Sequence, residues 1–110
     1  MSTLIALMVL FAAAVLEAGG DALVRKGLHA PPATRLAFLL AAAAVLLGYG
    51  CLVNAPKWDF GRLLGVYVVF FFVVAQLINW LVFRIVPGGG MLAGGACIVL
   101  GGAIIAAAGN

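Results

Sequence analysis

The stretch TLIALMVLFAAAVLEAGGDALVR, residues 3–25, decides the fold class of this chain. It carries no charge before Glu17, and it is long enough for a membrane-crossing helix, which needs about 20 mostly apolar residues. Two acids and a base, Glu17, Asp21 and Arg25, then follow at four-residue spacing, which places them on one helical face. The stretch therefore predicts a membrane helix that carries ionisable side chains in its second half.

Three similar apolar runs follow, separated by the short breaks GLHAPPAT, NAPKWDF and PGGG. Continuous apolar runs of this length exclude a β-barrel, whose strands alternate over about ten residues. The breaks are too short to hold a further domain. We expect one all-α integral membrane domain, residues 1–110, with both termini on the same side. Its four transmembrane helices are expected over about 3–25, 34–53, 60–83 and 91–108.

The composition agrees with a membrane environment. Hydrophobic residues make up 67% of the chain and charged residues 8%, and mean hydropathy is +1.32. A soluble domain is about 45–50% apolar and about 25% charged. The lipid bilayer is therefore the expected surroundings. The net charge of +3 comes from scattered residues without a basic stripe, so nucleic acid is not an expected partner.

The basic residues favour one orientation only weakly. Loops one and three carry more of them than the opposite side, where Lys57 and Arg62 lie. The positive-inside rule places loops one and three in the cytoplasm, but by only about two charges, which leaves dual topology open. We expect a multi-pass protein of the inner (cytoplasmic) cell membrane.

Glu17 is the main candidate for a titrating group. A carboxylate near mid-membrane costs about 2.5–3.5 kcal/mol on insertion scales, so it is expected to face a protein interior or a wet cavity, where the neutral acid is favoured. Such a carboxyl can exchange its proton for a cation. The alternative is a span that ends early, with Glu17 at the interface. Asp21 either pairs with Arg25 or shares the proton and substrate site. Gly20 leaves room beside the carboxylates for a helix or a ligand.

The third span offers further polar candidates. Gln76 and Asn79 are expected to form hydrogen bonds between helices, with ligand contact as the alternative. Tyr67 and Trp80 either line a cavity or mark the membrane interface.

The fourth span carries glycine pairs seven residues apart, which predict a smooth helix-packing face. The pairs either pack within the chain or, as we expect, form a dimer interface. They are Gly94, Gly95, Gly101 and Gly102.

The chain has no nucleophile elbow, phosphate-binding loop or cluster of metal ligands. We therefore expect no enzymatic activity, no cofactor and no metal. Cys51 and Cys97 occur singly in apolar runs, and we interpret both as small core residues.

These features together resemble the small multidrug resistance (SMR) superfamily, small four-helix proteins related to half of a drug/metabolite transporter. The family has an essential Glu in its first helix, with a Gly three residues later and a basic residue eight later, and Glu17, Gly20 and Arg25 match. The fourth-helix glycine spacing also matches. The middle section NAPKWDFGRLLGVY resembles the YnfA-like branch. Asp21 stands where the family usually has an uncharged residue.

The resemblance implies a proton-coupled exporter or antiporter of a small cationic substrate, which works as a homodimer, antiparallel or of dual topology. Glu17 would bind the proton or the substrate, with Tyr67 at an aromatic position of the family's binding site. The first alternative is an accessory or half-unit membrane subunit, such as part of a drug/metabolite-transporter-like or lipid-carrier flippase assembly. The second is a channel for a small solute.

Overall fold

The computed structural model of the chain describes residues 2–108. Over these residues the chain is helical, with four helices that are long and apolar enough to cross a membrane. The expected all-helical architecture with four such helices is thereby confirmed. The helices are α1 (Thr3–Leu28), α2 (Pro32–Val53), α3 (Phe60–Leu81) and α4 (Gly89–Ala108).

Local side chains define where the helices begin. The Ser2 hydroxyl accepts a hydrogen bond from the Ile5 amide at 3.2 Å and caps α1. The Asp59 carboxylate accepts one from the Arg62 amide at 2.9 Å and caps α3. These bonds satisfy amides that lack a partner within the helix. α2 starts with a proline in its first turn, where the missing N–H costs nothing.

The helix ends differ slightly from the expected spans. α1 continues to Leu28, beyond the expected end near residue 25, and its last turn contains Arg25 and Lys26. Basic side chains there interact favourably with the negative end of the helix dipole. α3 ends at Leu81, and the linker to α4 contains Arg84, whose φ of 61° lies in the left-handed region.

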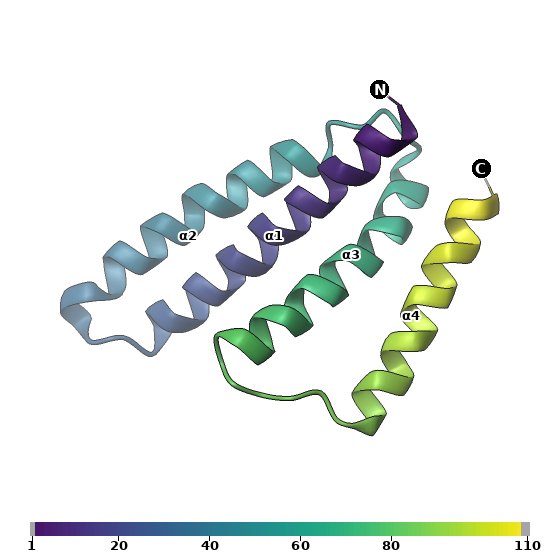
Figure 1. Cartoon of the computed structure of the whole chain (residues 1–110). Coiled ribbons are helices and arrows are strands. Elements are labelled where there is room, and N and C mark those ends of the chain that lie inside the picture. Colours follow the sequence, from purple (N-terminus) through teal and green to yellow (C-terminus); the bar gives the residue numbers. More distant parts are fainter. Residues whose placement is uncertain (1, 109–110) are drawn as a thin grey trace.

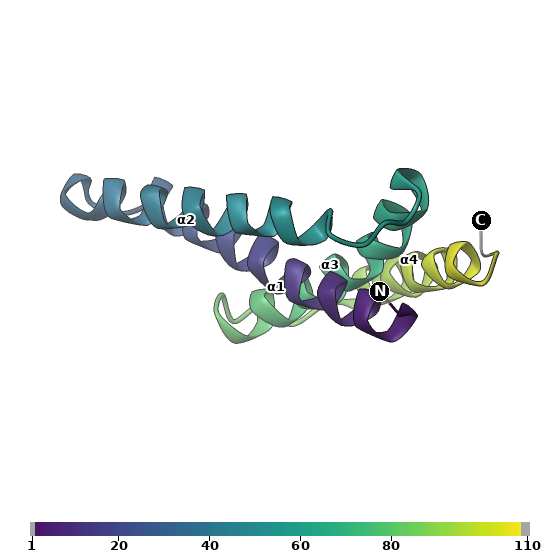
Figure 2. The same ribbon diagram turned by 90° about the horizontal axis from the view of Figure 1, so that it is seen from above.

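The four helices lie side by side in the order α2, α1, α3, α4, and the main contacts join neighbours in this order (Figure 1). The molecule is a flattened body with extents of 49 × 34 × 18 Å, and the view from above shows how thin it is (Figure 2). The N-terminal end of α1, the α2–α3 loop and the C-terminal end of α4 lie at one end. The other two loops lie at the opposite end.

A large part of the apolar surface is left uncovered. Many large hydrophobic side chains point outward, including Leu47 and Val86, each 71% exposed, and Leu4 at 68%. Contiguous apolar surface of this kind is rare on soluble monomers, whereas lipid tails can cover it. This distribution agrees with a multi-pass membrane protein.

The core lies where α1 crosses α3. Small residues of α1 allow close approach of the two helices, and the buried Leu10, Ala13, Ala14 and Ala18 form its side of the core. Tyr67 lies among the buried residues of α3 on the other side. Gly20 and Gly27 allow α1 to approach α2 closely. A Cβ at Gly20 would lie 2.6 Å from Leu46, and a Cβ at Gly27 would lie 3.0 Å from Phe38.

Among the described residues, α4 packs against α3 alone. Gly95 lies beneath the Phe72 ring, and Gly102 lies against Val69. The Arg62 guanidinium also donates a hydrogen bond to the Ala106 carbonyl at 3.3 Å, which satisfies a carbonyl in the last turn of α4. No other helix of the described residues covers the opposite face of α4.

The expected core position of both cysteines is wrong, because Cys51 and Cys97 are exposed. Among the described residues, α2 packs mainly on α1 and α4 packs on α3, so most of the surface of α2 and α4 has no protein to cover it. Apolar sequence alone does not separate a lipid-facing side from a protein-facing side.

Candidate functional site: a carboxylate among three helices

Glu17 and Tyr67 meet at the crossing of α1 and α3. The Tyr67 hydroxyl donates a hydrogen bond of 2.7 Å to Oε1 of Glu17. Tyr67 is almost fully buried, with 4% of its surface exposed, and Glu17 is half-buried. A hydrogen bond that ends on a carboxylate is stronger than one between neutral groups, so Tyr67 fixes the carboxyl group at the middle of the molecule.

Aromatic rings from two helices surround this hydrogen bond. The Tyr67 ring lies 5.8 Å from the Tyr49 ring of α2 and 6.3 Å from the Phe71 ring of α3, measured between centroids. Tyr49 was not among the residues predicted from sequence. The only signal for it is a phenol between two glycines in an apolar run, and that pattern does not say toward which helix the ring points.

Glu17 has no basic partner in the part of the chain that the structure describes. Among residues 2–108, no Lys, Arg or His side chain lies within 4.0 Å of its carboxylate. Arg25, the nearest basic residue on α1, is two turns away, about 12 Å along the helix axis. A carboxylate in an apolar environment needs a counter-charge or a proton. Residues 2–108 supply no such counter-charge, so the counter-charge or the proton must come from elsewhere.

The two explanations offered for Asp21 are an ion pair with Arg25 and a share in the site. Within the described residues the two side chains form no ion pair. The Arg25 guanidinium lies instead over the Phe83 ring, 5.8 Å from its centroid, in a cation–π arrangement. Asp21 therefore has no partner on its own helix.

Asp21 and Arg25 line a cavity of about 310 Å³ between α1 and α3. The amides of Gln76 and Asn79 face it from α3, and the rings of Phe71 and Phe83 form part of its apolar wall. The side-chain oxygen Oε1 of Gln76 is buried and accepts no hydrogen bond. Gln76 therefore does not make the expected interhelical hydrogen bond through this atom. An unpaired buried acceptor costs about 1–3 kcal/mol.

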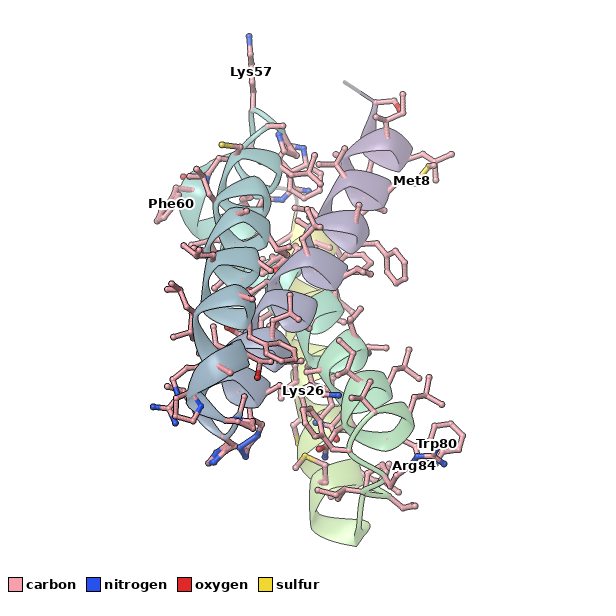
Figure 3. The ribbon with its side chains drawn as sticks, turned by 90° about the vertical axis from the view of Figure 1, so that its left-hand side faces the viewer. Met8, Lys26, Lys57, Phe60, Trp80 and Arg84 are labelled. Carbon is pink, nitrogen blue, oxygen red and sulfur yellow. The ribbon has the colours of Figure 1, made fainter. Side chains whose placement is uncertain are left out.

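Two of the predicted pocket residues lie away from Glu17's hydrogen bond. Gly20 contacts Leu46 of α2, so the room it leaves is used by a neighbouring helix. Trp80 is 51% exposed. It points away from the molecule beside Arg84 (Figure 3).

The glycine pairs of α4 divide between two faces. Gly95 and Gly102 pack against α3 in the same chain, whereas a Cβ at Gly94 or Gly101 would meet no atom within 4 Å. The structure therefore places one member of each pair in an intramolecular contact and leaves the other free on a separate face.

Within residues 2–108, no three His, Cys, Asp or Glu side chains form a group that could hold a metal ion. No family model, no curated protein and no solved structure matches the chain.

Proposed function

We propose that the chain is a proton-coupled exporter of small molecules that carry a positive charge, of the type found in the SMR superfamily. The observation that carries the proposal is the Glu17 carboxyl group, held by Tyr67 at 2.7 Å at the crossing of two membrane helices. It has no basic partner among the described residues. A proton and a cation are the two species that can neutralise it, and they exclude each other.

This competition is the basis of coupling. When a proton binds Glu17, the cation loses its counter-charge and leaves; when the cation binds, the proton is released. A helix pair that opens to one face and then to the other would carry one species in each direction. The Tyr67 hydroxyl can donate to the carboxylate or accept from the protonated acid, so it keeps Glu17 in place in both states.

We further propose that two copies assemble into the working transporter. α4 covers only α3, and its open face carries Gly94 and Gly101, which allow a second helix to approach closely. A dimer would also bring a second Glu17 to the transport path.

The central test is Glu17→Gln in purified protein reconstituted into liposomes. We expect the variant to fold and to lose proton-linked uptake of a cationic substrate, because the amide cannot exchange a proton for a cation. Uptake and internal pH are measured together after a pH gradient is imposed.

Asp59→Asn is the matched control. It removes a carboxylate from the α2–α3 loop and keeps a residue that caps a helix equally well, so transport is expected to continue. Undiminished coupled uptake by Glu17→Gln protein would refute the proposed mechanism.

A further inference from the structure

We infer that the cavity between Asp21 and Arg25 is a binding site for a small zwitterion of the amino-acid class, which carries an ammonium group and a carboxylate on one carbon. The inference goes beyond the proposed function, because it concerns a second site on α1 and a ligand whose two charges cancel. It concerns a cavity that the hydrogen-bonded pair Glu17 and Tyr67 does not line.

The cavity offers one full charge of each sign from the same helix. Asp21 and Arg25 are four residues apart, so their Cβ atoms are neighbours at about 5–6 Å. They nevertheless form no ion pair, because the guanidinium lies over the Phe83 ring. Both side chains are exposed, so a ligand that enters the cavity can reach each charge. A molecule with two opposite charges side by side satisfies both at once.

The amides on the facing helix complete the recognition. Oε1 of Gln76 is a buried acceptor without a donor, and an ammonium group brings three N–H donors. The ammonium group can therefore bind the Asp21 carboxylate, and the Gln76 oxygen can accept from it once that side chain turns into the cavity. The ligand carboxylate is left for the Arg25 guanidinium and the Asn79 amide, which both donate hydrogen bonds.

A simple cation or a simple anion fits this cavity less well. Arg25 repels a cation that enters alone, and Asp21 repels an anion. Either ligand also leaves one of the two charged groups without a partner. A zwitterion avoids both the repulsion and the unpaired charge.

The dimensions restrict the ligand to a small one. A volume of about 310 Å³ is at the lower limit of ligand pockets, which range over about 300–1,000 Å³. The rest of the lining is largely apolar and includes Phe71, Ile78 and Phe83. An amino acid with an apolar side chain, such as leucine, meets both conditions.

The test compares leucine with its two halves in the full chain, reconstituted in lipid nanodiscs. Radiolabelled L-leucine is displaced by unlabelled leucine, by 3-methylbutylamine, which lacks the carboxylate, and by 4-methylpentanoate, which lacks the amine. We expect leucine to compete at concentrations at least about tenfold lower than either analogue, because each analogue gives up a charge-assisted hydrogen bond.

Arg25→Gln is expected to reduce the affinity for leucine to that for the amine, with binding of the amine retained or improved. Lys26→Gln is the matched control, because it removes the same charge from the next residue, which does not line the cavity. Arg25→Lys keeps the charge and is expected to keep part of the preference, which excludes simple loss of folding as the cause.

The inference is wrong if the amine competes as well as leucine does in the unaltered chain, or if Lys26→Gln has the same effect as Arg25→Gln. Both results are equilibrium measurements without a proton gradient. They can therefore fail while Glu17-dependent transport holds, and transport can fail while they hold.

Discussion

At the scale of single residues, the described part of the chain holds ionisable groups that lack partners of opposite charge. Glu17 is held by one hydroxyl, and Asp21 lies one turn further along α1, facing the cavity with Arg25. The spacing of these residues was visible in the sequence. Their surroundings were not, because Tyr67 and Gln76 lie on α3 and come close to α1 only through the helix crossing.

The hydrogen bond between Tyr67 and Glu17 is expected to stabilise the folded chain. Tyr67→Phe removes the hydroxyl and keeps the ring against Tyr49 and Phe71. We expect a loss of about 1–2 kcal/mol in the free energy of unfolding, since hydrogen bonds to charged groups contribute more than neutral ones but membrane helices often find replacements. Reversible unfolding in mixed micelles measures it. Phe71→Leu removes a ring but no hydroxyl, so it separates loss of packing from loss of the hydrogen bond. A free energy of unfolding for Tyr67→Phe equal to that of the unaltered chain would contradict the prediction.

At the scale of helices, α4 is apolar on every side, and only its contact with α3 distinguishes one face from another. Neighbouring glycines therefore have different surroundings. Gly102 contacts the β-branched Val69, whereas Gly101 is free. The sequence predicted a glycine packing face, but it did not show which member of each pair packs within the chain.

Substitution of the two neighbours by alanine is expected to have opposite effects. Gly102→Ala places a methyl group against Val69, whose branched side chain has little rotamer freedom in a helix, and we expect a loss of about 1–3 kcal/mol from overpacking. Gly101→Ala has open space and a better helix propensity, so the stability of a single chain is expected to stay equal or rise. Unfolding in detergent measures both, and equal destabilisation by the two alanines would overturn this placement of α4.

The free glycine face also bears on assembly. If α4 pairs with a second copy, Gly101→Leu is expected to weaken self-association in lipid, measured by energy transfer between labelled chains, while the helix content is retained. Energy transfer that is unaffected by Gly101→Leu, and by the same change at Gly94, would exclude this face from the dimer.

At the scale of the whole molecule, the arrangement is a flat row of four helices with basic residues at both ends. Lys57 projects from one end, and Lys26 and Arg84 lie toward the other. α1 runs from one end of the row to the other and α2 runs back, so the start of α1 and the α2–α3 loop lie at the same end. The nearly balanced charge at the two ends explains why the sequence does not determine the orientation of the row in the membrane.

Cysteine labelling tests this arrangement. In a background with Cys51 and Cys97 replaced by alanine, Ser2→Cys and Lys57→Cys are expected to react with a membrane-impermeant reagent from the same side, and Arg84→Cys from the other. A single orientation gives labelling from one side only, and dual topology gives labelling of each position from both. Labelling of Ser2→Cys and Lys57→Cys from opposite sides in a single-orientation population would contradict the four crossings.

The sequence by itself determined the apolar surroundings, the all-helical class and the four helices. The length and mean hydropathy of a segment are local properties that do not depend on tertiary contacts. It also indicated that Glu17 lies deep within a helix. The tertiary structure alone decided which side of each helix faces protein. In a segment that is apolar all round, hydropathy does not specify rotation about the helix axis, and this rotation is set by the fit of side chains at the crossings. That is why Tyr49 and the cavity beside Asp21 emerged only from the packed helices.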